Sequence, residues 1–333
     1  TMKEARGSTV KQNTLVVVYD SCLLTLDLAA QVYVQIFRLS YGNARSYYTS
    51  LTADHRDEYP YVYLTYNSNK RGSTRFSIFD LDSKAIVNHR TEVLMNTMGG
   101  VYHNGVIYYE TAETLVMYDP LVNNVTIQTA LDATCFSDSN YLHSFDNTTL
   151  LSIGHTMCDI DLKDVRQRDG LIQERILKEG YPMTAFSFLR NQTALLLFQY
   201  VEQKRESEVI VYRFGEVSFW HSNTLVFPQV VRVALDYHLD GQLYTLVFTV
   251  SPGLSMTTLY IISNRWTPAG SIDNIPLYVR SAYVMESNEV LLVGDRSKVI
   301  ILKLKKRDPT PPPAKPSIFL ALAVSIPMMT LLP

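Results

Sequence analysis

Apolar and polar residues alternate along most of the chain in short runs that are separated by polar turns. Six of these runs are each followed, after a polar turn, by a second run. The first runs are 61–66, 105–110, 148–154, 194–200, 242–248 and 289–295, and the second are 75–81, 114–120, 156–162, 208–214, 257–263 and 298–304. Such alternating runs, rich in Val, Ile, Tyr and Thr, predict antiparallel β-hairpins. Helical patterning is confined to 171–180, which fits a strand and a turn equally well.

The hairpins recur at a regular interval. Equivalent points in the second runs are 39 to 52 residues apart, measured between Phe79, Tyr118, Ile160, Tyr212, Ile261 and Leu302. This interval is typical of one blade of a β-propeller, in which four-stranded sheets repeat radially and few sheet edges stay exposed. A β-sandwich would need no such interval. The sequence therefore predicts an all-β propeller of five to seven blades.

The two ends differ from the repeating part. Residues 1–45 supply N-terminal strands, which either belong to the first blade or follow a truncated start, and 46–305 form the propeller. A proline-rich spacer covers 306–316, and an uncharged apolar tail covers 317–333. A polar spacer followed by an apolar tail fits a cleaved signal for a glycosylphosphatidylinositol (GPI) anchor, a short membrane tail, or neither. Either of the first two would associate the product with a membrane.

Composition and charge narrow the class of protein. Among 333 residues, 47% are hydrophobic and 19% are charged, as in a folded globular protein. The net charge of −2 gives no general attraction to nucleic acid, so no nucleic-acid partner is expected. The 22 tyrosines favour a half-buried sheet surface.

Cysteines and glycosylation sequons bear on the compartment. Of the three cysteines, Cys135 and Cys158 are the pair expected on neighbouring strands; the alternative is three buried thiols that include Cys22. Asn-x-Ser/Thr sequons occur at Asn124, Asn147 and Asn191 and permit glycosylation in a secreted protein.

Catalytic motifs are missing from the sequence. It holds no Gly-x-Ser-x-Gly, no phosphate-binding glycine loop and no His-Glu-x-x-His. The cluster that most resembles a metal site is His155, Asp159 and Asp161, which we interpret as a solvated strand face. Asp80, Asp119 and Asp161 are predicted to cap turns, and residues 103–105 to form a hairpin turn. No catalytic residue is assigned, and the protein is predicted not to be an enzyme.

The stretch MGGVYHNGVIYYETAETLVMYDP (98–120) resembles the olfactomedin domain, with its glycine-rich entry, Val-Tyr-x-Gly strand and following Tyr-ended strand. VALDYHLDGQLYTL (233–246) is similar to that family's Leu-Asp-Tyr-Asn segment, and MTAFSFLRNQTALLLF (183–198) to its Asn-Ala-Phe strand. The resemblance implies an extracellular five-bladed propeller that binds other proteins, in many members with calcium near the axis.

The resemblance also indicates which residues would hold calcium. The family's metal-binding aspartate falls on Asp236, whereas two further ligand positions fall on Thr184 and Leu142. Calcium prefers six to eight oxygen ligands with several carboxylates among them. We therefore expect a degraded calcium site and no cofactor.

Together these features predict an extracellular, membrane-associated adhesion or signalling module. It would bind other proteins through propeller loops, with the membrane contacted through the tail or a lipid anchor. A propeller hydrolase or lyase is one alternative, favoured if carboxylates and a histidine converge near the axis. An intracellular kelch-like or WD-like scaffold is the other.

Overall fold

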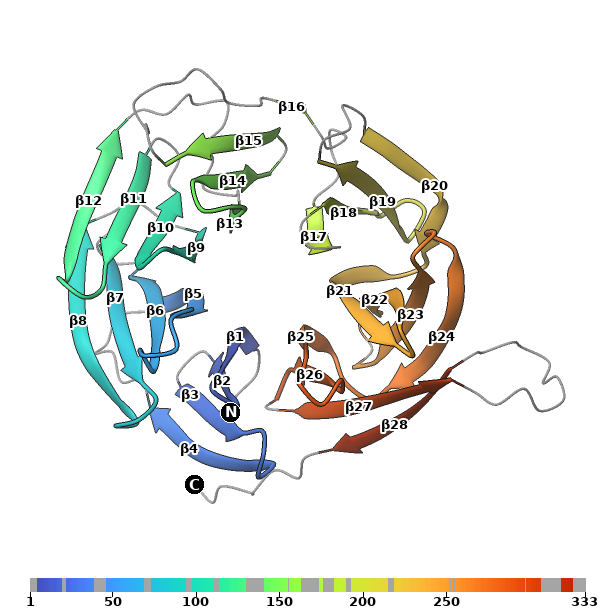
Figure 1. Ribbon diagram of the computed structural model, residues 1–333, viewed down its shortest axis with the longest axis horizontal. Helices are drawn as coiled ribbons and strands as arrows, with labels where there is room; N and C mark the ends of the chain where they lie inside the picture. Colours follow the sequence, from blue (N-terminus) through green and yellow to red (C-terminus); the bar gives the residue numbers. More distant parts are fainter. Residues whose placement is uncertain are drawn as a thin grey trace, which may run out of the picture. The chain divides into compact units, whose positions relative to one another are not determined.

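The chain folds into antiparallel β-sheets in the computed structural model (Figure 1). The structure describes all residues outside 1–4, 20–21, 39–45, 69–72, 94–97, 111–113, 130–140, 155, 163–173, 176–182, 190–192, 215–218, 252, 254, 297, 307–318 and 326–333. The described residues form strands β1 to β28 and no helix. These strands make seven four-stranded sheets, the blades of a β-propeller. The all-β propeller prediction is confirmed with seven blades, whereas the olfactomedin resemblance implied five.

The blades fall into two compact units, and the first is Arg6–Lys178. Its four sheets follow the chain order, so each strand pairs with the next one. Their strands are β1 (Ala5–Lys11), β2 (Thr14–Tyr19), β3 (Cys22–Asp27), β4 (Val32–Arg38); β5 (Ser46–Ala53), β6 (Tyr61–Ser68), β7 (Ser73–Asp80), β8 (Ala85–Val93); β9 (Met98–His103), β10 (Val106–Glu110), β11 (Thr114–Asp119), β12 (Asn124–Thr129); and β13 (Tyr141–Ser144), β14 (Thr149–Ile153), β15 (Thr156–Asp161), β16 (Glu174–Arg175).

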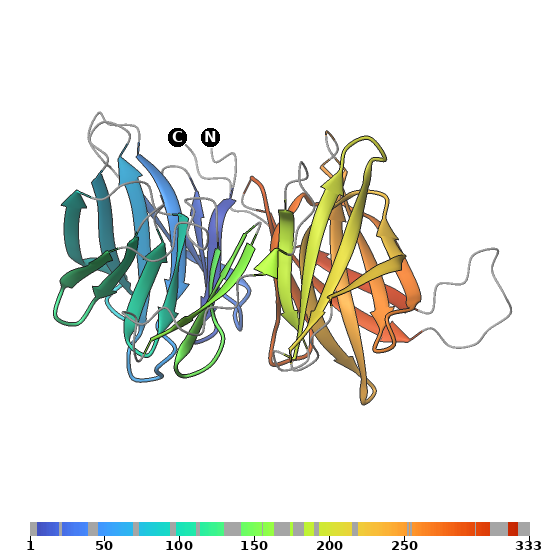
Figure 2. The ribbon, with the colours of Figure 1, turned by 90° about the horizontal axis from the view of Figure 1, so that it is seen from above.

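The second unit combines Glu179–Pro333 with Thr1–Ala5 and holds three sheets. Figure 2 shows the same ribbon from above, with the long strands of these sheets side by side. The strands are β17 (Met183–Leu189), β18 (Ala194–Val201), β19 (Glu206–Arg213), β20 (Phe219–Phe227); β21 (Val230–Leu239), β22 (Gln242–Val250), β23 (Thr257–Ser263), β24 (Pro268–Ile275); and β25 (Val279–Val284), β26 (Val290–Gly294), β27 (Val299–Lys306), β28 (Phe319–Ser325). The predicted hairpins are the second and third strands of the blades.

The hydrophobic core lies between neighbouring sheets. One buried cluster combines Tyr63, Phe76 and Ile78 of β6 and β7 with side chains of β9 to β11, including Tyr102 and Tyr118. Phe76 stacks on Tyr118 with ring centroids 4.6 Å apart. The second strands are buried on both faces, so they are continuous apolar runs, as in other sheets that are covered on both sides. Within the first unit, neighbouring sheets therefore share one core.

Polar residues define the turns between third and fourth strands. The carboxylates of Asp27, Asp80 and Asp119 each accept hydrogen bonds from the backbone N–H groups two and three residues later. This is the Asx turn expected of an aspartate at a strand end. The predicted capping by Asp80 and Asp119 is confirmed, and for Asp161 most of the following turn lies outside the described residues. The turn from β9 to β10 is confirmed at Asn104 and Gly105, both with positive φ.

A hydroxyl group links consecutive blades in the second unit. The Ser207 hydroxyl donates to the carbonyl of Gln229 (2.8 Å) and accepts from the backbone N–H of Val231 (3.2 Å). Thr257 makes the same pair of bonds in the next blade, to Leu277 (2.5 Å) and from Val279 (3.2 Å). Each hydroxyl lies at the start of the third strand of its blade, and its two partners lie where the following blade begins. The hydroxyl therefore fixes the connection between the two blades.

The apolar C-terminal segment contributes to the last sheet. Strand β28 pairs with β27 from Lys306↔Phe319 to Ile300↔Ser325. Among the described residues, no helix has the length and hydropathy of a membrane span. Cleavage in the proline-rich spacer would remove β28 and leave β27 as the sheet edge. The anchor stays a prediction, and it competes with this strand for the same residues.

Substitution of Gly100 by alanine should destabilise the fold. A Cβ atom at Gly100 would overlap the buried ring of Tyr109, which is hydrogen-bonded to Thr65. Overpacking of this kind costs about 1–3 kcal/mol. Urea unfolding should show this loss for Gly100→Ala. At the control Gly7→Ala, where the nearest atom is 3.4 Å from the new Cβ, the free energy of unfolding should stay within about 0.5 kcal/mol. Equal effects of both changes would contradict the packing.

Candidate functional site

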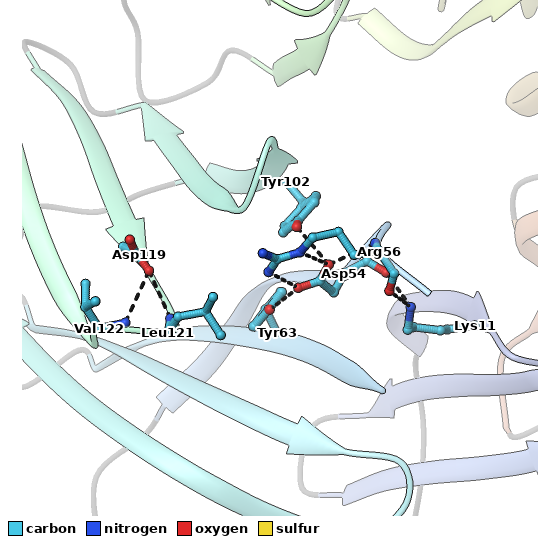
Figure 3. Close-up of polar contacts among 8 residues, drawn as sticks. All are labelled: Lys11, Asp54, Arg56, Tyr63, Tyr102, Asp119, Leu121 and Val122. Carbon is cyan, nitrogen blue, oxygen red and sulfur yellow. Dashed lines mark hydrogen bonds and ion pairs between the residues drawn. The ribbon is translucent and has the colours of Figure 1, made fainter. Parts of the chain in front are cut away.

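The best-defined polar site in the described residues is built around Asp54, at the start of the loop 54–60 between β5 and β6 (Figure 3). Asp54 is only 2% exposed. Its Oδ1 accepts hydrogen bonds from the backbone N–H (3.0 Å) and Nε (3.0 Å) of Arg56, and its Oδ2 accepts from Nη2 (2.7 Å). The hydroxyls of Tyr63 and Tyr102 donate to the same carboxylate, Tyr102 over 2.7 Å. Five donors therefore surround one buried carboxylate.

The local sequence explains the loop. Asp54 follows strand β5 directly, and its carboxylate bond to the N–H two residues later is an Asx turn. The backbone N–H of Asp54 donates to the carbonyl of Tyr61 (3.0 Å), which closes the hairpin below the turn. The loop thus begins and ends at fixed points, with Arg56 held in a bidentate ion pair at its start.

Electrostatics keep this carboxylate ionised. Burial alone would raise the pKa of Asp54, but the hydrogen bonds from Arg56, Tyr63 and Tyr102 outweigh burial and bring the pKa to about 2. Burial, followed by the bond to Asp54, raises the pKa of both tyrosines, so they stay protonated. The hydrogen bond that Arg56 itself donates to Asp54 raises the pKa of Arg56. With its lone pairs occupied and its proton lost, Asp54 is poorly suited to act as a general acid or base at neutral pH.

Lys11 connects the loop to the first blade. Its ammonium group, at the end of β1, donates to the carbonyls of Asp54 (2.7 Å) and Arg56 (2.9 Å). The side chain of Gln12 donates to the carbonyl of Asp57 (3.2 Å). Because Tyr102 belongs to the third blade, the loop is fixed by three consecutive blades at once.

The outer surface of the loop is polar and aromatic. His55, Asp57 and Glu58 are exposed, and the side chain of Arg56 is 32% exposed. The Arg56 guanidinium lies over the ring of Tyr59, with Cζ 4.1 Å from the ring centroid. The buried Asp54 cluster beneath the loop is therefore rigid, and the exposed groups carry charge of both signs.

One further turn lies beside this loop, and a second turn contacts that one. A Cβ atom at Gly105 would be 3.5 Å from Nη1 of Arg56, which places the β9–β10 turn next to the loop. His103 then bridges to the fourth blade through Nδ1 to the Ser144 hydroxyl (2.8 Å) and Nε2 near the carbonyl of Asn147 (3.2 Å). We call the turns 12–13, 54–60, 104–105 and 145–148 the loop face of the first unit.

The predicted calcium residues fall in both units. Thr184 lies in β17 and donates to the carbonyl of Phe198 (3.3 Å), and half-buried Asp236 lies in the neighbouring strand β21. Leu142 lies in β13 and packs with apolar residues of the first unit. The described part of the chain holds no group of three His, Cys, Asp or Glu side chains placed to bind a metal. The calcium assignment stays a prediction.

The remaining predicted sites are placed only in part. Asn124 and Asn147 are exposed, whereas Asn191 lies outside the described residues. Cys158 is buried and disulfide-bonded, and Cys22 is a buried cysteine outside any disulfide. Cys135 is outside the described residues, so its pairing with Cys158 stays a prediction. In the proposed solvated face, Asp159 is half-buried and Asp161 is exposed, while His155 is not described.

Comparisons with known proteins support the fold alone. No protein-family model matches the sequence, and no curated protein matches it. The structure resembles Hsv2 of Kluyveromyces lactis (TM-score 0.60, 11% identity, 98% of this chain and 100% of that one). It also resembles hydrazine synthase of Kuenenia stuttgartiensis (0.65, 11%, 90% and 95%). A third match is the extracellular domain of the putative one-component system BT4673 from B. thetaiotaomicron (0.62, 10%, 90% and 38%).

The depressed pKa of Asp54 predicts a pH-dependent contribution to stability. Its folded-state value of about 2 lies below the ordinary 3.8, so the contribution is complete above about pH 5 and is lost as the pH falls through 4 towards 2. The shift corresponds to about 2 kcal/mol. Asp54→Asn should cost about 3 kcal/mol at pH 7, because it weakens a buried ion pair. Urea unfolding between pH 7 and pH 3 should show the difference from the unsubstituted protein shrinking.

The exposed Asp57 gives a matched control. Asp57→Asn makes the same chemical change in the same loop, and its difference in unfolding free energy should stay near zero at every pH. A difference for Asp54→Asn that is constant across the range would show that this carboxylate is not the titrating group.

Proposed function

We propose that this protein is a non-catalytic binding module and that a protein partner contacts the loop face of the first unit. The observation that carries the proposal is the Asp54 cluster, which holds Arg56 in one orientation yet leaves its outer edge in solvent. Arginine and tyrosine residues with restrained side chains are enriched at the centres of protein interfaces, because little side-chain entropy is lost on binding. Arg56 and Tyr59 together form such a pair.

The charges around this pair indicate the chemistry of the partner surface. Arg56 stands beside Asp57 and Glu58, so the loop offers both signs within a few residues. A complementary surface would also be mixed in charge, and the affinity would depend on orientation more than on net attraction. This agrees with a chain whose net charge is only −2.

We further propose an extracellular, membrane-associated setting and an olfactomedin-like relationship. The disulfide of Cys158 and the exposed sequons at Asn124 and Asn147 support an oxidising compartment. The fold likeness to the extracellular domain of BT4673 is compatible with it. The polar spacer and apolar C-terminal segment supply the membrane link, as a lipid-anchor signal or a short tail.

Site-specific crosslinking tests the loop face. A photo-crosslinking amino acid at Glu58 should yield one discrete protein adduct in the cells that make this protein. The same residue at Ser83, an exposed position in the β7–β8 turn of the same blade, should yield none. Arg56→Lys and Tyr59→Ala should each reduce the Glu58 adduct at least fivefold, because lysine cannot reproduce the arginine fork. Equal adduct yields at Glu58 and Ser83, or a Glu58 adduct yield that these substitutions leave unchanged, would contradict the proposal.

Surface labelling and peptide mapping test the setting separately. Full-length protein should be labelled at the cell surface, carry glycans at Asn124 and Asn147, and contain a Cys135–Cys158 disulfide. A phospholipase that cleaves lipid anchors should release it if the tail is an anchor signal, and its C-terminal peptide should then end before Phe319. Unglycosylated cytosolic protein with reduced cysteines would instead favour the intracellular scaffold.

A further inference from the structure

The first strands of several blades share a local irregularity near their start. One residue is skipped in the pairing with the second strand, which makes a β-bulge, and the skipped residues are Thr49, Gly99, Thr184, Arg232 and Arg280. A bulge re-aims the side chain of the extra residue. In the second unit the last two bulges carry arginine, at equivalent positions of consecutive blades. They can therefore be compared directly.

Arg280 has a carboxylate partner. Its Nε and Nη2 donate to the two carboxylate oxygens of Asp295 over 2.9 and 3.0 Å. Asp295 immediately follows Gly294, which pairs with Val279 next to the bulge. The same carboxylate accepts from the backbone N–H of Ala5 (3.2 Å). This bulge arginine is thus neutralised within the fold.

Arg232 lacks the equivalent partner. In its blade Val231 pairs with Thr249, so the position that corresponds to Asp295 is Val250, which is 1% exposed. Arg232 Nη2 donates to the Tyr278 hydroxyl (3.0 Å), whereas its buried Nε has no hydrogen-bond partner among the described residues. No carboxylate in the described part of the chain pairs with it. Arg232 is half-buried as a residue and its Nε is fully buried, so part of the hydration of the guanidinium is already lost.

Tyr278 adds a second donor at the same place. Its hydroxyl oxygen accepts the bond from Arg232, and within the described residues the hydroxyl proton is not donated to another group. The Tyr278 ring contacts both guanidinium groups, with ring centroid to Cζ distances of 5.9 Å for Arg232 and 4.7 Å for Arg280. The charges of Arg232, Arg280 and Asp295 sum to one positive unit.

We propose that Arg232 and the Tyr278 hydroxyl bind a carboxylate group of a ligand. The fold itself shows which group suits this bulge, because Asp295 fills the equivalent place beside Arg280. A ligand carboxylate would accept charge-assisted hydrogen bonds from the guanidinium and a bond from the tyrosine hydroxyl. The carboxylate belongs either to a small acid or to the side chain of an acidic peptide. This site lies in the second unit and does not depend on the loop face.

Thermal unfolding at pH 7 with defined probes tests the site. Sodium succinate and a hexaglutamate peptide represent the two sources, with sodium chloride at matched ionic strength as the reference for screening. Either carboxylate probe should raise the melting temperature saturably by about 2–4 °C above the reference. The response should be lost in Arg232→Gln and weakened in Tyr278→Phe, which keeps the ring but removes the donor.

Arg265→Gln is the matched control, because it removes the same charge from an exposed turn of the same blade. It should respond as the unsubstituted protein does. A response to succinate assigns a small acid, and a response confined to the peptide assigns an acidic segment of a partner. A larger response to inorganic phosphate than to either carboxylate, an unchanged response in Arg232→Gln, or no response to any probe overturns the proposal.

Discussion

The structure depends on one constraint, which is that no blade can bury its own faces. The second strands are apolar on both sides, so each sheet must pack against its neighbours before either face leaves water. The buried clusters accordingly combine side chains from more than one sheet, for example β6 and β7 with β10 and β11. Polar groups then fix the relative position of adjacent sheets. Ser207 and Thr257 do so by holding both backbone groups at the start of the following blade.

The Asp54 cluster also fixes the relative position of adjacent blades. A buried carboxylate is costly, and only full hydrogen bonding makes it tolerable. Here the compensation comes from two blades, since Tyr63 lies in the second and Tyr102 in the third. Lys11 of the first blade donates to the backbone carbonyl of Asp54 instead. Alignment of the blades is therefore a condition for satisfying the charge. The same hydrogen bonds hold the exposed side of Arg56 in one orientation, and a recognition surface requires side chains that are held in this way.

The sequence predicted the hairpins well because their signal is local. Apolar runs bounded by polar turns predicted the second and third strands to within a few residues. The dipeptide Asn104-Gly105 was sufficient to predict a tight turn with positive φ. The blade number was harder to predict, because the strands of 1–45 could not be assigned to a blade and 317–333 reads as a membrane tail. In the structure these segments hold β1 to β4 and β28. Their pairing partners are not visible in the pattern of either segment.

The Asp54 site was missed for a related reason. The stretch Ala53 to Pro60 is polar and reads as an ordinary loop, although an aspartate two residues before an arginine, directly after a strand, is a signal for an Asx turn with an ion pair. The contribution of Tyr102 could not be predicted, since it lies in another blade and depends on how the two sheets pack. Long-range partners of this kind follow from tertiary packing, whereas propensity and periodicity describe one element at a time.

A repeated fold also supplies its own reference for each position. The turns after the third strands keep one role with two residue types, since Ser263 and Asp80 each accept a bond from the backbone N–H two residues later. Such a substitution leaves the local hydrogen bonding complete. The pair of Arg232 and Arg280 is different, because the arginine is retained while its carboxylate is replaced by Val250. The packing of the blade explains why a serine can replace an aspartate in a turn. It does not explain an arginine that has no carboxylate partner among the described residues. This difference is the reason for proposing a binding role at Arg232 and none at Ser263.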